Sequence, residues 1–116
     1  MIRIAICDDV SIIGLAVKSV LESHNFGEKL KIDCFIDGMA LLQQAMKEKY
    51  DILIMDIQLV ESEQVGDVLN GMEISNRIKG IYPDITVIFM TGNTGYERQL
   101  LNFEPQNGML VLVYGR

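Results

Sequence analysis

The stretch Asp51-Ile-Leu-Ile-Met-Asp56-Ile-Gln58 decides the fold of this 116-residue chain. The four consecutive apolar residues at positions 52–55 predict a buried strand, because helices cover both faces of a central parallel strand. This strand runs directly into a carboxylate, Asp56. Burying an acid costs free energy unless a charge or a hydrogen bond compensates it, so the position of this carboxylate requires an explanation.

Two further apolar runs also end in polar residues. Residues 2–7 are followed by Asp8-Asp9, and residues 85–90 are followed by Thr91-Gly92. Parallel strands bring their carboxyl ends to one edge of a sheet, so we expect the three strand ends to meet and form a site. Each has a simpler explanation when taken alone, since the paired acids suit a helix cap and Thr91-Gly92 suits the start of a loop.

Composition indicates a single globular domain. Hydrophobic residues make up 49% and charged residues 22% of the chain, and no apolar run approaches the roughly 18 residues of a membrane span. The net charge of −6 and the lack of a basic run exclude a nucleic-acid-binding surface within this sequence. No export signal is present at the start, and Cys7 and Cys34 are expected to be buried core residues. We therefore expect a reducing cytoplasm.

Strand and helix patterns alternate along the sequence. Short apolar or alternating runs predict strands at residues 3–7, 30–35, 51–56, 85–90 and 109–114. Apolar residues three or four positions apart predict helices at residues 10–24, 39–49, 70–79 and 94–103. The expected buried faces of the first two helices consist of Ile13, Ala16, Val17, Val20, Leu21, Met39, Leu42, Ala45 and Met46.

Turn-forming residues predict where the helices begin and end. We expect Asp37 to cap the second helix and Asn70 to cap the third. Gly80 is expected to end the third helix in the left-handed conformation, with Pro83 blocking any continuation. The only histidine in the sequence, His24, falls near the end of the first helix and is expected at the surface.

The order βαβαβαβαβ predicts an open parallel sheet with helices on both faces and right-handed crossovers. In the flavodoxin-like version the five strands follow the order 2-1-3-4-5. Ligands bind there between strands 1 and 3, at their carboxyl ends. The pattern therefore places Asp8, Asp9 and Asp56 in one crevice.

Three carboxylates in one crevice repel one another and would raise each other's pKa values. A hard divalent cation relieves that repulsion, and an all-oxygen site with room for water suits Mg²⁺. An aspartate beside the cation, Asp56, can act as a nucleophile toward phosphorus. Thr91 supplies a hydroxyl for a phosphoryl oxygen, and Gly92 leaves space for that group.

At these residues the sequence resembles the CheY-like receiver domains of two-component response regulators, and most of all the receivers attached to LytTR-type DNA-binding domains. The matching segments are residues 6–9, 51–58, 71–74 and 87–92, within a resemblance that covers residues 1–104. This resemblance implies that a histidine kinase is the partner and that its phosphohistidine donates the phosphoryl group.

The resemblance also assigns roles to individual residues. Asp56 would be the phosphoacceptor, and Thr91 the switch hydroxyl that moves toward the phosphoryl group. Asp8, Asp9, Asp56 and the backbone carbonyl of Gln58 would hold Mg²⁺, and Gly92 would line the phosphoryl pocket.

Two parts of the sequence depart from this family. Its receivers carry a lysine followed by a proline at the end of the fifth strand, where the lysine pairs with the phosphoryl group. That position falls near residues 111–113 here, and no lysine follows Lys79. Losing this lysine would weaken phosphorylation or uncouple it from the switch. Arg116 is the nearest cation, and Tyr114 is expected to pack in the core. The loop at residues 58–69 is longer than usual and is expected to be solvated.

The family's final helix has no counterpart in this sequence. We therefore expect one domain over residues 1–116 with a truncated or altered C-terminus. Apolar surface left on the first helix and the fifth strand favours a homodimer or the exchange of elements between copies.

The predicted function is a phosphorylated switch rather than a turnover enzyme. It would contact DNA only through an effector domain absent here, and it would not associate with a membrane. One alternative is a pseudo-receiver, a protein-interaction module that is not phosphorylated. Another is an aspartyl-phosphate phosphatase of the haloacid dehalogenase type, which would need a second acid where Gln58 stands.

Overall fold

A computed structural model describes residues 1–56, 71–91 and 109–113 of the chain, with Thr91 and residues 109–113 described through their backbone. Within these ranges the elements are β1 (Ile2–Cys7), α1 (Ser11–Glu22), β2 (Leu30–Phe35), α2 (Gly38–Lys47), β3 (Ile52–Asp56), α4 (Gly71–Ile81), β4 (Thr86–Thr91) and β5 (Met109–Val113). The predictions for residues 58–70, 92–108 and 114–116 lie outside the described residues.

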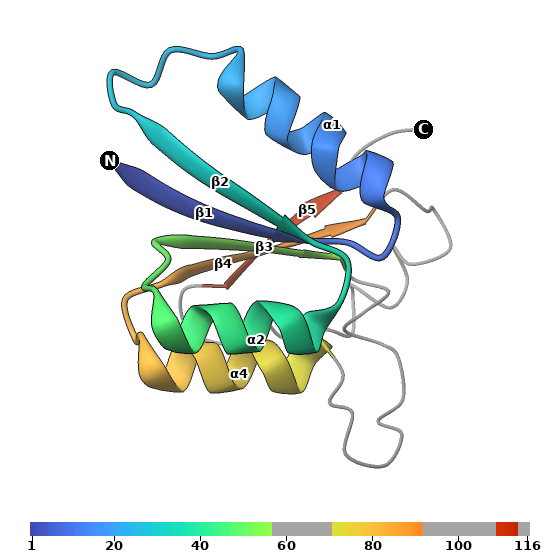
Figure 1. The fold of residues 1–116 in the computed structure, drawn as a ribbon, viewed down its shortest axis with the longest axis vertical. Coiled ribbons are helices and arrows are strands. Elements are labelled where there is room, and N and C mark those ends of the chain that lie inside the picture. The colour runs from blue at the N-terminus through green and yellow to red at the C-terminus, as the bar shows by residue number, and fades with distance from the viewer. Residues whose placement is uncertain (57–70, 92–108, 114–116) are drawn as a thin grey trace.

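The five strands form one parallel sheet in the order β2-β1-β3-β4-β5. This result confirms the predicted fold class and strand order. Helix α1 lies on one face of the sheet, and α2 and α4 lie side by side on the other (Figure 1). Strands β1 and β3 are neighbours, so the reversal of strand order falls between them as expected.

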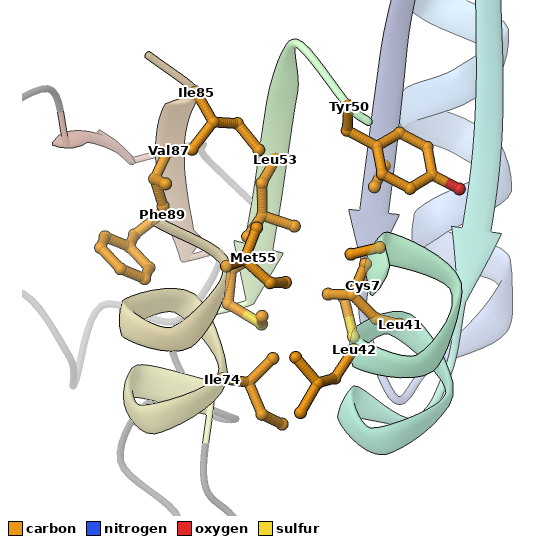
Figure 2. Close-up of a cluster of buried hydrophobic side chains, with 13 residues drawn as sticks. Cys7, Leu41, Leu42, Tyr50, Leu53, Met55, Ile74, Ile85, Val87 and Phe89 are labelled. Atoms are coloured by element: carbon orange, nitrogen blue, oxygen red, sulfur yellow. The ribbon is translucent and has the colours of Figure 1, made fainter. Parts of the chain in front are cut away.

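The larger core lies between the sheet and helices α2 and α4. Every second residue of the central strands points into it, and the helices contribute apolar residues at helical spacing. Figure 2 shows Leu42 of α2 and Ile74 of α4 pointing toward each other beneath the strand residues. The buried members of this core are Ala5, Cys7, Leu41, Leu42, Ala45, Tyr50, Leu53, Met55, Ile74, Ile78, Ile85, Val87 and Phe89.

The opposite face of the sheet carries a smaller core beneath α1. Its buried members are Ile4, Ile6, Ile32, Ile54 and Met90, with Ile13, Val17 and Leu21 of the helix partly buried against them. Ala16 and Val20, predicted to belong to the buried face of the helix, are exposed. The reason is that α1 covers only part of this face of the sheet (Figure 1).

Helix α2 begins as predicted, because the Asp37 carboxylate accepts a hydrogen bond from the Met39 amide at 3.0 Å. Met46, which was predicted on the buried face of α2, is exposed. Leu41, which was not predicted there, is buried. The prediction that Gly80 ends α4 was also wrong, because that helix continues to Ile81.

One helical hydrogen bond and one tertiary contact explain why α4 continues past Gly80. The Tyr82 amide donates to the carbonyl of Ile78 at 2.8 Å, and the Tyr82 hydroxyl donates to the carbonyl of Ala45 on α2 at 2.8 Å. Pro83 follows and has no amide hydrogen to continue the helix. Gly80 needs no left-handed conformation, and among the described glycines only Gly27 has a positive φ, of 72°.

The two cysteines lie on opposite faces of the sheet. Cys7 is buried as predicted, but Cys34 is exposed, because the edge strand β2 is only partly covered by α1. The Cys34 thiol donates a long hydrogen bond to the carbonyl of Gly14 on that helix. His24 follows α1 and is exposed, as expected. Within the described residues, none of the helices is long and apolar enough to cross a membrane.

Candidate metal centre

The ends of β1 and β3 bring two acids together. In the register of these strands Cys7 lies beside Met55, so Asp8 and Asp56 follow at the same edge of the sheet. The amide of Asp8 donates to the carbonyl of Phe35 at 3.0 Å, which extends the pairing with β2 and fixes the backbone there. Carboxylate oxygens of Asp8, Asp9 and Asp56 all lie within 4.8 Å of one another. The structure thus brings the three predicted acids into one cluster.

Burial differs among the three acids. The exposed fractions of Asp8 and Asp56 are 2% and 7%, whereas Asp9 is exposed. A site with two buried carboxylates and one open to solvent can bind a hard cation that keeps some of its water ligands. The donor set therefore fits Mg²⁺.

The Asp8 carboxylate is held by the backbone. Its Oδ1 accepts a hydrogen bond from the amide of Val10 at 2.9 Å. The pKa of Asp8 is raised above its usual value, mainly by burial and also by Asp9, although the hydrogen bond from Val10 opposes the rise. A cation beside these oxygens would reverse this effect, since it favours the ionised carboxylate.

The hydrogen bond to Val10 also corrects an alternative explanation. Val10 is the residue that precedes the first turn of α1, and no side chain caps the helix there. Asp8 accepts from the amide two residues along rather than from the helix, so the paired acids are not a helix cap. This role of Val10 was not predicted from the sequence, although an aspartate that accepts from the amide two residues on is a common turn pattern.

Cys7 precedes the cluster in sequence, but its side chain belongs to the buried core between the sheet and helices α2 and α4. Burial raises the pKa of its thiol to about 12, and the nearby carboxylates of Asp37, Asp8, Asp56 and Asp9 add to the rise. The thiol is therefore protonated at neutral pH when no metal is bound. The ligands offered at this edge are oxygen atoms.

The remaining predicted site residues are only partly described. Asp56 pairs with Met90, so the backbone of Thr91 lies one residue further along β4 at the same edge of the sheet. Thr91 in turn pairs with Val113 of β5. Gln58 and Gly92 lie outside the described residues.

Comparison with known proteins agrees with this fold. The family model described as the response regulator receiver domain matches residues 4–105. The sensory transduction protein LytT of Bacillus anthracis is 28% identical over 95% of this chain and 41% of its own length. The transcriptional regulatory protein RprY of Bacteroides fragilis is 23% identical over 89% of this chain and 39% of its own length.

A solved structure provides a further comparison. The response regulator protein TrrA of Thermotoga maritima, in complex with Mg²⁺-BeF, is 25% identical with a TM-score of 0.66. The match covers 97% of this chain and 87% of TrrA. The present chain spans about two fifths of the length of LytT and RprY. The predicted resemblance to receivers, including those of LytT-type regulators, is confirmed.

Proposed function

This chain belongs to the response regulator receiver domain family, and we propose that it is a switch that accepts a phosphoryl group on Asp56. The donor is the phosphohistidine of a histidine kinase. The observation that carries this proposal is the cluster of three carboxylates within 4.8 Å of one another at the carboxyl ends of β1 and β3. Three carboxylates repel a phosphoryl group, so the site would need a cation, and acids from two strands would hold that cation.

Asp56 would act as the nucleophile, and the other two acids would help it to hold the cation. An Asp56 carboxylate oxygen attacks phosphorus, the P–N bond to the donor histidine breaks, and its electron pair returns to the imidazole. Asp8, fixed by Val10, and the exposed Asp9 would hold Mg²⁺ together with Asp56 and the carbonyl of Gln58. When bound, Mg²⁺ supplies neutralising charge for the phosphoryl oxygens and the carboxylates.

The switch itself is proposed to use the end of β4. Thr91 would bond a phosphoryl oxygen, and Gly92 would leave room for the group. No lysine follows Lys79 in the sequence, so the cation that pairs with the phosphoryl group in the family has no counterpart on β5. We expect phosphorylation to shift the β4–β5 edge less strongly than a lysine-bearing site would.

The test is intact mass after incubation with acetyl phosphate, with and without Mg²⁺. We expect one added phosphoryl group that requires Mg²⁺ and is lost in Asp56→Asn. The matched control is Asp84→Asn, which removes an exposed acid before β4 and should leave the adduct unchanged. Asp8→Asn should reduce both the adduct and the affinity for Mg²⁺, measured separately by titration calorimetry.

Two results would contradict the proposal. A folded chain that binds Mg²⁺ without forming an adduct would rule out the phosphoacceptor function. An adduct that persists in Asp56→Asn would place the phosphoryl group on another residue. The first result would favour the second candidate function, an interaction module that is not phosphorylated. The missing lysine is the specific observation in favour of that candidate.

The partners follow from the same proposal. A histidine kinase would be the physiological donor. Phosphorylation would change how the chain associates with a second copy of itself. Contact with DNA would be made by an effector domain rather than by this acidic unit, whose net charge is −6. We place the switch in the bacterial cytoplasm, where such kinases hold their phosphohistidine, and we do not expect it to be a turnover enzyme.

A further inference from the structure

Strand β2 lies at an edge of the sheet (Figure 1), and half of its backbone points away from the sheet. The Ile2 amide donates to the carbonyl of Lys29 at 2.8 Å, and the Asp8 amide donates to the carbonyl of Phe35 at 3.0 Å. In a parallel pair every second residue directs both its amide and its carbonyl toward the same neighbouring strand. The residues between them direct these groups outward, and in β2 they are Leu30, Ile32 and Cys34.

This edge lacks the features that usually prevent a further strand from pairing. Edge strands are commonly protected by a bulge, a proline or a free charge. Strand β2 contains no proline and pairs with β1 in an unbroken register over all six of its residues. Its two charged side chains are engaged, because Lys31 lies 3.8 Å from the carboxylate of Glu48 and Asp33 accepts from the Tyr50 hydroxyl at 2.6 Å.

An open pocket of about 470 Å³, the β2 pocket, lies along the same edge. Helix α1 contributes Lys18, helix α2 contributes Gln44 and Glu48, and residues 31–35 of β2 complete the lining. An extended peptide paired with β2 would direct its side chains alternately toward the α1 face and the α2 face. A segment of about six residues, or about 20 Å, would match the length of the strand.

Lys18 gives the β2 pocket a preference for an acid. Its side chain is half-buried, and it forms no ion pair within the described residues, not even with Glu22 four positions further along α1. Both acids of the pocket already accept hydrogen bonds from neighbouring side chains. A partly buried charge is stabilised by pairing. The chain's net charge of −6 is screened beyond about 8 Å at physiological salt, so the charge of Lys18 dominates at this short range.

We propose that β2 and the β2 pocket bind an extended acidic segment of a partner protein, which adds a further strand beside β2. The segment pairs with the outward amides and carbonyls of Ile32 and Cys34, and one of its carboxylates pairs with Lys18. A second copy of β2 fits this role less well, because its only acid, Asp33, is held by the hydroxyl of Tyr50. The proposal does not depend on phosphorylation.

Hydrogen exchange, followed residue by residue by nuclear magnetic resonance, tests the backbone pairing. The probe is a blocked hexapeptide of alternating glutamate and valine, and the control peptide has lysine in place of glutamate. In the free chain, the amides of Lys31 and Asp33 should exchange slowly and those of Ile32 and Cys34 rapidly. The glutamate peptide should slow exchange at Ile32 and Cys34, and the lysine peptide should not. Unchanged exchange with millimolar glutamate peptide would overturn the proposal.

Two pairs of variants separate the backbone contact from the charge contact, with affinity measured by fluorescence anisotropy of labelled peptide. Cys34→Pro removes an outward amide and should weaken binding at least about tenfold relative to Cys34→Ala, which keeps that amide. Lys18→Glu should also weaken binding at least about tenfold. Its control is Arg77→Glu, at an exposed position on α4, which makes the same change in net charge and should bind like the parent chain.

Folding and phosphorylation are monitored separately. Circular dichroism checks each variant, and if Cys34→Pro does not fold, the charge pair and the exchange pattern still decide the outcome. Asp56→Ala should bind the peptide like the parent chain, so failure of the phosphorylation test leaves this result intact. Equal affinities of Lys18→Glu and Arg77→Glu would overturn the proposal. Slow exchange at Ile32 and Cys34 in the free chain that is lost on dilution would also overturn it, because a second copy would then occupy the edge.

Discussion

Both faces of the sheet are apolar, but helices cover them to different extents. On the α2–α4 face, thirteen of the described residues form a continuous buried core, and Leu41, Val87 and Phe89 have no exposed surface. On the α1 face, five of the residues that the structure describes are buried, and an apolar groove lies beside the helix. Both faces come from equally apolar strands. The difference shows that strand sequence sets how much surface must be covered, whereas the number of helices on a face decides how much is covered.

Paired truncations on β4 should produce the largest contrast between the faces. Phe89 and Ile88 are adjacent in sequence, but Phe89 points into the α2–α4 core (Figure 2) and Ile88 lines the groove. Phe89→Ala should cost about 3–5 kcal/mol of unfolding free energy, because it leaves a cavity in a closed core. Ile88→Ala should cost about 1 kcal/mol, since this side chain already meets solvent. Urea unfolding measures both free energies, and equal losses would mean that the groove is filled.

Paired glycine substitutions should produce a smaller contrast of opposite sign. A Cβ at Gly38 would lie 2.4 Å from the Cδ1 atom of Ile74, whereas a Cβ at Gly14 would meet Ile6 and Cys34 at ordinary distances of 3.8 and 3.9 Å. Gly38→Ala should therefore destabilise by about 1 kcal/mol through overpacking. Gly14→Ala should stabilise by about 0.5–1 kcal/mol, because alanine favours a helix interior.

The cause of the Gly38→Ala effect can be isolated in a double-mutant cycle. Ile74→Val removes the Cδ1 atom that the new Cβ would strike. If the clash is the cause, the two substitutions together should cost less than the sum of their separate effects. Additive costs, measured by urea unfolding, would show that the space between α2 and α4 is not limiting at this point.

Labelling of the two thiols should produce the smallest contrast. It reports which face of the sheet is open to solvent. Cys34 is exposed near α1, while Cys7 is buried in the α2–α4 core. A water-soluble thiol reagent should label one cysteine in the folded chain and both after denaturation, with Cys34→Ala removing the native labelling. Rapid labelling of Cys7 in the folded chain would show that the α2–α4 core opens readily.

The pH dependence of stability follows from the buried thiol. Burial raises the pKa of the Cys7 thiol to about 12 in the folded chain, whereas the pKa in the unfolded chain is near the usual value of 9.0. The unfolded state therefore binds fewer protons in this interval, and the free energy of unfolding should fall as pH rises from 9 to 12. Burial and the Asp33 carboxylate also raise the pKa of Tyr50, which contributes in the same direction. Cys7→Ala should reduce the slope of this fall.

Much of the candidate site could be predicted from local sequence. Apolar runs that end in Asp8-Asp9 and Asp56 predict parallel strand ends, and the strand order places these ends together. Whether Asp8 would accept from the Val10 amide or cap the helix could not be decided in advance, because an aspartate just before a helix can accept from backbone amides in either way. The true extent of α4 was likewise hidden, since the contact that extends it past Gly80 joins Tyr82 to Ala45 on a different helix.

The sequence by itself determined the alternation of strands and helices, the parallel sheet and the acids at its edge. These features depend on residue periodicity and on chain connections, which are local properties. Only the tertiary structure decided that Val20, Met46 and Cys34 are exposed and that Leu41 is buried. Periodicity marks which side of an element is apolar, but burial depends on whether a second element lies against that side. On this sheet the α2–α4 face has two such helices, and among the described residues the other face has one.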